Sequence, residues 1–167
     1  PAQNAPAYFI YSRREGATGI LHLYMSVPLV TRLQKEMRGD VSVSSKDLVT
    51  YSRDTSIFTR TPEVVVFPKD KEDVASLVRA VHTAKQEGMP VSISARSAGT
   101  CMSGGSLTTS VVAVFTKYIN KVIEVRNGYA VVEPGCYYRD FEKATLADGN
   151  QILPSYPASR EIAALGG

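Results

Sequence analysis

The sequence has little of what metal sites and disulfide frameworks are built from. Its 167 residues include two cysteines, Cys101 and Cys136, and two histidines, and no Cys-x-x-Cys pair occurs. Zinc and iron–sulfur sites therefore have no support from the sequence, and we expect no bound metal. Two isolated thiols are typical of a reduced compartment, so we expect a cytoplasmic protein; a disulfide between the two is the alternative.

Long apolar runs and blocks of one charge are also missing. The apolar run over residues 20–25 is too short to cross a membrane, and the first residues show no signal-peptide pattern. Lysine and arginine number 19 against 16 acidic residues, and this net charge of +3 is spread along the chain. Such a distribution does not imply nucleic acid as a partner. With 44% hydrophobic residues, the chain is long enough for one ordinary folded core.

The most informative segment that is present is a loop of glycines and other small residues. A short β-branched strand over residues 91–94 leads into the loop at 95–106, which contains one arginine, Arg96. Few side chains stand in the way of such a backbone, so its consecutive N–H groups can approach an anion. The loop therefore predicts a phosphate or pyrophosphate site, with an ordinary tight turn as the alternative.

The segments upstream of the loop predict a strand, a helix and a second strand. Residues 63–67 form a compact β-branched run that Pro68 closes. Asp70 is placed to cap a helix whose apolar residues recur at helical spacing and which Gly88 ends. Together with the strand at 91–94, these segments predict a βαβ unit with a right-handed crossover.

Downstream of the loop the chain enters another strand, at residues 110–115, rather than a helix. Rossmann and P-loop sites place their glycine loop between a strand and a helix, so that the phosphate sits at the helix N-terminus. Neither Gly-Lys-Ser/Thr nor Gly-x-Gly-x-x-Gly occurs in the sequence. Both architectures are therefore excluded, and an anion at this loop would be held by backbone amides and by Arg96.

The remaining segments add a helix, a hairpin and a further helix. Ser26 as a cap and Pro28 in the first turn predict a helix to Met37, whereas residues 40–61 are polar and rich in turns. Asn-Gly at 127–128 lies between two β-branched runs, which strongly indicates a hairpin. The predicted hairpin strands are 119–125 and 129–133, the further helix is 138–148, and residues 1–19 and 150–158 are irregular or extended.

Four motifs follow one another along the chain: a strand and helix at 61–68 and 72–74, the loop at 95–105, a hairpin at 116–121 and 132–135, and the segments 153–159 and 164–167. In this order they resemble the FAD-binding domain of FAD-linked oxidases of the vanillyl-alcohol oxidase and p-cresol methylhydroxylase type. Within that family the sequence is most similar to the D-lactate dehydrogenase and glycolate oxidase flavoproteins. The resemblance implies an α+β fold, with an N-terminal extension carrying one helix at 1–45 and part of the FAD-binding domain at 46–167. We accordingly expect a fragment of a longer protein.

The resemblance also implies a cofactor and the residues that hold it. The cofactor is FAD, bound non-covalently, because Thr100 stands where covalent members carry a histidine. Ser97 and Ala98 replace two glycines that are frequent in the family's loop, but small residues still allow close backbone approach. The implied cofactor-binding residues are Arg96, Ser97, Ala98, Gly99, Thr100, Gly104 and Gly105 at the pyrophosphate, and Pro157, Ser159, Gly166 and Gly167 along the flavin and its linker.

Some of these residues have simpler interpretations. Arg96 either offers its charge to the anion or pins the loop by donating hydrogen bonds to carbonyl groups. Ser159 is otherwise a turn residue or a helix N-cap. Tyr51 and Asp54 match a Tyr-x-x-Asp that resembles the family's lead-in, and we interpret both as structural rather than catalytic. Cys101 is more simply a small loop residue than a reactive thiol.

By the same resemblance, the whole protein is an FAD-dependent oxidoreductase that oxidises a D-2-hydroxy acid such as lactate or glycolate by hydride transfer to flavin N5. Its partners would be that substrate and an electron acceptor, and the remainder of the protein could contact an iron–sulfur partner or the inner membrane. No catalytic residue is assigned, because the family supplies most of those groups from outside this segment, and the fragment alone is expected to be inactive. The alternatives are another FAD enzyme of the same fold, such as a sugar-lactone oxidase or a cell-wall precursor reductase, and a non-redox module that binds an anion.

Overall fold

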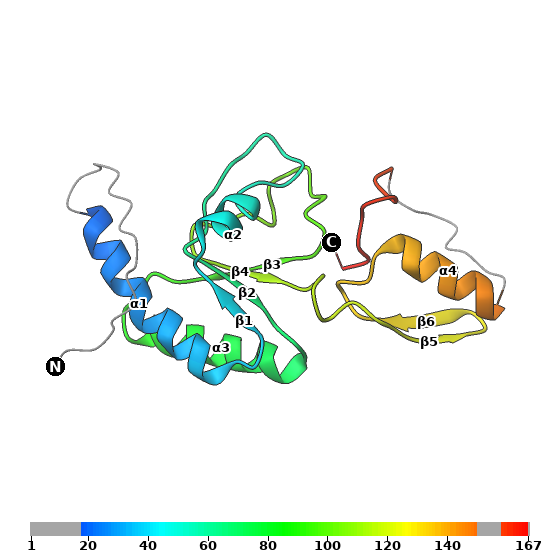
Figure 1. Cartoon of the computed structure of the whole chain (residues 1–167), viewed down its shortest axis with the longest axis horizontal. Helices are drawn as coiled ribbons and strands as arrows, with labels where there is room; N and C mark the ends of the chain where they lie inside the picture. The colour runs from blue at the N-terminus through cyan, green and yellow to red at the C-terminus, as the bar shows by residue number, and fades with distance from the viewer. Residues whose placement is uncertain (1–17, 150–157, 167) are drawn as a thin grey trace.

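The computed structural model describes residues 18–149 and 158–166, and the chain forms two parts that lie side by side (Figure 1). One part holds a four-stranded sheet with helices, and the other holds a two-stranded hairpin with one helix. The elements of the first part are α1 (Thr18–Glu36), β1 (Asp40–Ser42), α2 (Ser45–Thr50), β2 (Val64–Phe67), α3 (Lys71–Gln86), β3 (Ile93–Arg96) and β4 (Val111–Val114). Those of the second part are β5 (Val122–Arg126), β6 (Tyr129–Val132) and α4 (Tyr138–Gly149). The predicted α+β class is confirmed.

The sheet has the strand order β1-β2-β4-β3. Strands β2 and β3 both run parallel to β4, whereas β1 pairs antiparallel with β2 at one edge. The predicted unit of β2, α3 and β3 is present, but β4 lies between its two strands. Because β3 and β4 are parallel, the loop between them has to run back along the whole length of a strand. The carboxyl ends of β2, β3 and β4 consequently meet at one edge of the sheet.

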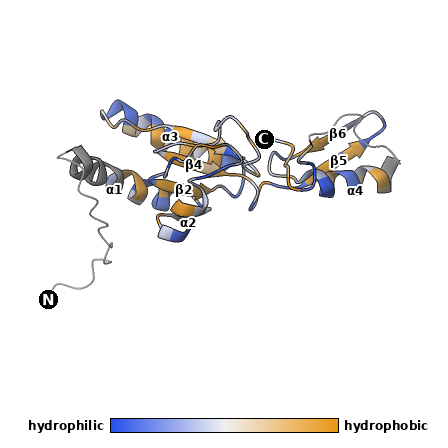
Figure 2. Ribbon diagram, turned by 90° about the horizontal axis from the view of Figure 1, so that it is seen from above, coloured by the Kyte–Doolittle hydropathy of each residue, from blue (hydrophilic) through white to orange (hydrophobic). Residues whose placement is uncertain are grey.

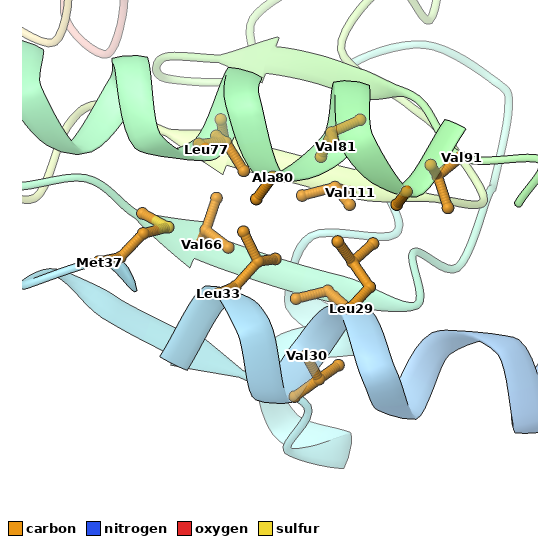
Figure 3. Packing of buried hydrophobic residues seen from close by; sticks show 13 residues of the cluster. Leu29, Val30, Leu33, Met37, Val66, Leu77, Ala80, Val81, Val91 and Val111 are labelled. Atoms are coloured by element: carbon orange, nitrogen blue, oxygen red, sulfur yellow. The ribbon is translucent and has the colours of Figure 1, made fainter. Parts of the chain in front are cut away.

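Helices α1 and α3 pack side by side on one face of the sheet (Figure 3). Leu29 and Leu33 of α1 and Leu77 of α3 meet the inward side chains of β2 and β4 there. The other face carries a smaller cluster that includes Val65 and Val112. Strands β2 and β4 are thus buried on both faces, which explains why both are continuous β-branched runs. Figure 2 shows hydrophobic residues on these two strands and both kinds of residue on the amphipathic helix α3.

The second part is built on the predicted hairpin. Asn127 and Gly128 form the turn between β5 and β6, and Gly128 has a φ of 91°. Such a backbone conformation favours glycine, as two-residue hairpin turns require. Helix α4 packs against β5. The connection from the sheet is close-packed at Gly135, where an added Cβ would lie 2.6 Å from the carbonyl oxygen of Ile119.

Three predictions about the N-terminal region need correction. Helix α1 begins at Thr18 rather than near Ser26, and Pro28 lies inside it. A proline within a helix removes one backbone donor, and here the helix continues on both sides of it. The region 40–61, predicted to be turns, contains β1 and α2. Both are too short for a periodic pattern, and α2 buries none of its residues.

Further predictions concern the ends of the chain and its division into regions. The predicted irregular segment 1–19 lies largely outside the described residues, as does most of the extended loop at 150–158. The division at residue 45 stays a prediction, although α1 and β1 share the sheet's core. In the described part of the chain, no helix has the length and apolar character needed to cross a membrane.

Asp73, in the first turn of α3, ties the α1–β1 connection to the sheet. Its carboxylate accepts hydrogen bonds from the backbone N–H groups of Arg38 at 3.0 Å, Gly39 at 2.8 Å and Lys69 at 3.0 Å. The side chain is only 2% exposed. Burial opposes ionisation, but the backbone hydrogen bonds outweigh it, and the pKa of Asp73 is lowered. Asp70 caps the same helix as predicted, accepting from the Asp73 N–H at 3.0 Å.

Replacing Asp73 by asparagine should lower the free energy of unfolding at about pH 7 by about 1–3 kcal/mol, because a buried acceptor of charge-assisted bonds is lost. A carboxylate with a lowered pKa stabilises the fold above its unfolded pKa of about 3.9, and this contribution disappears as the pH falls through the folded pKa. Urea denaturation at about pH 7 and about pH 3 measures the difference. Glu72→Gln, at an exposed position of the same turn, is the control. A penalty for Asp73→Asn that is the same at both pH values would contradict the assignment.

Candidate functional site

The predicted anion loop begins at the carboxyl edge of the parallel strands. Arg96 is the last residue of β3, and its carbonyl accepts a hydrogen bond from Phe115 N–H at 2.9 Å, just past the end of β4. Phe67 ends β2 at the same edge. In open α/β sheets, ligands bind outside the carboxyl ends of the strands. The topology therefore places the loop where this class of sheet usually holds a ligand.

Two glycines give the loop a backbone that other residues rarely adopt. Gly99 has a φ of 73° and Gly104 a φ of 77°. A Cβ at Gly99 would lie 2.7 Å from Cζ of Arg96, and one at Gly104 would lie 3.0 Å from Cδ2 of Phe58. Both positions thus favour glycine for backbone conformation, and a side chain at either would also crowd a neighbouring side chain. These contacts are made with side chains of the protein itself, so the close approach of the loop backbone to an anion stays a prediction.

The guanidinium of Arg96 is buried beneath the loop and lacks a full set of partners. The residue is 8% exposed, and its Nη1 has no hydrogen-bond partner among the described residues. Its Cζ lies 5.3 Å from the ring centroid of Tyr51. Burial lowers the pKa of Arg96, and the nearby negative charge of Asp54 opposes this effect. Within the described part of the chain, the side chain donates to no loop carbonyl, so the pinning interpretation of Arg96 is not supported.

A second loop, residues 52–60, is joined to the predicted anion loop by hydrogen bonds. The N–H of Thr55 donates to the carbonyl of Gly99 at 3.2 Å, and its hydroxyl donates to the carbonyl of Cys101 at 3.1 Å. Asp54 accepts from Ser106 Oγ at 3.1 Å and from the Ser56 N–H at 2.9 Å. Burial opposes ionisation of Asp54, yet the hydrogen bonds outweigh it and its pKa is lowered. These contacts agree with a structural role for Asp54.

The two predicted cofactor segments meet at the carbonyl of Pro134. This oxygen accepts from Ser97 Oγ at 3.0 Å and from the Gly166 N–H at 2.9 Å. A Cβ at Gly166 would lie 2.7 Å from the same oxygen. The segment 158–166 is held further by the bond from Leu165 N–H to the carbonyl of Cys136 at 2.9 Å. Ser97 and Gly166 are therefore brought together, and their part in one cofactor site stays a prediction.

The other predicted site residues have more local roles or cannot be placed. Ser159 forms a turn, because its carbonyl accepts from the N–H groups of Ile162 and Ala163. The Gly105 N–H donates to Cys101 Sγ at 3.4 Å, so in this conformation its donor is used within the loop. Ala98 and Thr100 are half-buried within the loop. Two predicted residues, Pro157 and Gly167, lie outside the described residues.

Three features of the site were missed by the sequence argument. These are the Tyr51 ring against Arg96, the Thr55 contacts to the loop and the shared carbonyl of Pro134. The Tyr-x-x-Asp motif pointed to the right segment but not to its partner. Sequence separation explains the omission, because Tyr51 and Arg96 meet only after β2 and β3 have joined one sheet.

A neighbouring groove is less suited to an anion. It encloses about 520 Å³ between the N-terminus of α3 and Pro134. Asp70, Glu72 and Glu133 lie in its lining, with Lys71 as the basic residue there. Carboxylates repel a phosphate, so the anion site is better placed at the loop than in this groove.

The two cysteines should differ in reactivity. Hydrogen bonds from Ser103 and Gly105 lower the pKa of the half-buried Cys101, whereas burial raises the pKa of the fully buried Cys136. Because the thiolate is the nucleophile, iodoacetamide should modify Cys101 in the native chain well before Cys136. Mass spectrometry of tryptic peptides measures the rate at which each cysteine is modified. In the denatured chain, the control, both cysteines should be modified equally fast. Equal rates in the native chain would contradict the described loop.

Comparison with known proteins gives the family and the fold. A family model described as FAD binding domain matches residues 62–167. D-2-hydroxyglutarate dehydrogenase of Escherichia coli (strain K12) is 28% identical over 153 residues, which cover 90% of this chain. The enzyme of the same name from Pseudomonas putida is 28% identical over 132 residues, or 78% of this chain. The chain spans only 15% and 13% of the length of these two relatives.

Solved structures share the fold at lower sequence identity. A structure of p-cresol methylhydroxylase with substrate bound aligns with a TM-score of 0.69 at 21% identity, over 84% of this chain and 28% of that one. A structure of alkyldihydroxyacetonephosphate synthase gives the same TM-score and identity, over 83% of this chain and 28% of that one. The family resemblance found in the sequence is thus confirmed. The match over residues 62–167 shows that this chain belongs to the FAD binding domain family, whose cofactor is FAD.

Proposed function

We propose that the loop from Arg96 to Gly105 binds the diphosphate of FAD without a covalent link. The observation that carries this proposal is the buried guanidinium of Arg96, whose Nη1 has no partner among the described residues. A buried charge without a partner is costly, and a diphosphate supplies the opposite charge together with hydrogen-bond acceptors. The guanidinium lies against Gly99, within the loop whose backbone would meet the same anion.

The rest of the loop fits such a ligand. Gly99 and Gly104 hold the backbone at positive φ, and Ser97, Ala98 and Thr100 leave little side-chain bulk around it. Thr100 also lacks the imidazole that a covalent histidyl link to flavin requires. These residues therefore support non-covalent binding.

The second segment would contact the remainder of the cofactor. Gly166 is joined to Ser97 through the carbonyl of Pro134, so the flavin linker and the diphosphate would be held by neighbouring stretches of chain. We assign Gly167, Ser159 and Pro157 to the same segment on the basis of the sequence. The chain's role is then to bind and orient the cofactor.

We infer further that the protein carrying this chain is an oxidoreductase acting on a D-2-hydroxy acid. When bound, FAD supplies the two-electron acceptor for such an oxidation. Two relatives bear the name D-2-hydroxyglutarate dehydrogenase, which favours a dicarboxylic hydroxy acid over the lactate and glycolate suggested by the sequence. The electron acceptor, an iron–sulfur partner and a contact with a membrane surface belong to the same proposal.

Titration of the purified chain with FAD tests the cofactor site. We expect saturable binding, visible as a change in flavin absorbance and fluorescence, and release of unmodified FAD on denaturation. A folded chain that does not bind FAD would overturn the proposal and leave the non-redox anion module as the better interpretation.

Gly99→Ala should weaken FAD binding by about tenfold or more. The new Cβ would crowd the guanidinium of Arg96, and alanine adopts a positive φ less readily than glycine. Gly128→Ala is a matched control: its φ is also positive, at 91°, but the position is open and lies in the hairpin turn. Calorimetric titration gives the FAD affinity of each variant. Thermal unfolding without FAD measures how far the positive φ destabilises each variant. Equal FAD affinity in the two variants would remove Gly99 from the site.

The substrate class can be tested by flavin reduction in the protein that carries this chain. Under anaerobic conditions, D-2-hydroxyglutarate should bleach the visible flavin absorbance, and its L-enantiomer should not. D-Lactate and glycolate are tested beside it, and bleaching by either would favour the smaller substrate. Failure of all D-2-hydroxy acids to reduce a bound flavin would reject the substrate class while leaving the cofactor site intact.

A further inference from the structure

Arg96 is held in an unusual way for a buried arginine. The carboxylate whose charge acts on it is that of Asp54, but Asp54 is engaged by Ser56 N–H and Ser106 Oγ. Among the described residues, no ion pair or hydrogen bond joins Asp54 to Arg96. A buried guanidinium is usually paired with an acid, so something else must fix the position of this one.

The aromatic ring of Tyr51 supplies that contact. Tyr51 is the C-cap residue of α2, and its ring centroid lies 5.3 Å from Cζ of Arg96. The same ring meets Phe67 edge-to-face, with the two centroids 5.6 Å apart. Phe67 is buried at the end of β2 and belongs to the second core cluster. Tyr51 thus connects Arg96 to the sheet's core.

A cation–π contact differs from an ion pair because it does not occupy the N–H donors of the guanidinium. A cation–π contact attracts the guanidinium to the ring but supplies no acceptor of the usual N–H···O kind, so the N–H donors are left for other groups. Gly99 approaches the same group closely, at 2.7 Å between Cζ and the position of an added Cβ. Tyr51 therefore holds the guanidinium against the loop without consuming the donors that an anion would need.

We propose that Tyr51 is a positioning residue for the anion site. Its ring holds Arg96 under the loop by a cation–π contact, so that Nη1, which has no partner among the described residues, keeps its donors for the ligand diphosphate. The inference rests on the proposed function, because it concerns how the same FAD site is prepared before FAD arrives. It also gives the tyrosine of the Tyr-x-x-Asp motif a role through Arg96.

Calorimetric titration with FAD, applied to variants of this chain, tests the proposal. Tyr51→Leu removes the π face and should weaken FAD binding about twofold to thirtyfold, the range expected for a cation–π contact. Tyr51→Phe keeps the ring and should retain most of the affinity. Tyr51→Met, which also lacks a π face but still fills space against Phe67, replaces Tyr51→Leu if that variant does not fold. Tyr129→Leu, at an exposed tyrosine of β6, is the control and should bind FAD like the original chain.

The same substitution in an Arg96→Met background separates positioning from general stability. Tyr51→Leu should cost nothing further in FAD affinity there, because the group that it positions is gone. An equal loss of FAD affinity from Tyr51→Leu in both backgrounds would overturn the proposal. So would an unchanged affinity of Tyr51→Leu if Arg96→Met alone weakens binding. Normal affinity of Arg96→Met alone would overturn it as well. Absence of FAD binding by the original chain is a different outcome, since it rejects the proposed function itself.

Discussion

The buried guanidinium of Arg96 is the constraint on which the site depends. An arginine that is 8% exposed, with Nη1 unpartnered among the described residues, is unfavourable unless a ligand completes its contacts. Its place explains several neighbours at once. Gly99 has a positive φ, and the guanidinium fills the space where a side chain at this position would stand. Tyr51 lies with its ring centroid 5.3 Å from Cζ of Arg96, while the nearby carboxylate of Asp54 accepts from other groups.

The sheet creates this arrangement through its topology. Because β3 and β4 are parallel neighbours, the loop between them must return along the sheet, and loop 52–60 packs against it. The carbonyl of Pro134 then links the start of the loop to Gly166 in the C-terminal segment. Segments far apart in sequence are brought to one edge, where the ends of three parallel strands already favour ligand binding. The fold thus brings Arg96, the glycine loop and the C-terminal segment together at this edge.

Much of the fold could be predicted from local sequence. The β-branched runs that became β2 and β4 are continuous because both faces of these strands are buried, and Asn127-Gly128 fits only a few turn types. The loop was recognisable from its small residues. Elements without a periodic pattern, such as β1 and α2, could not be predicted. The helix start predicted from Pro28 was wrong because a helix can continue past one lost backbone donor. The contact of Tyr51 with Arg96 has no local signal, since it exists only in the assembled sheet.

The most direct test of this account is a crystal structure of the chain with FAD bound. We predict that Nη1 of Arg96 lies about 3 Å from a diphosphate oxygen, with the guanidinium still in contact with the ring of Tyr51. A diphosphate bound elsewhere, with Nη1 of Arg96 still without a partner, would contradict the central claim.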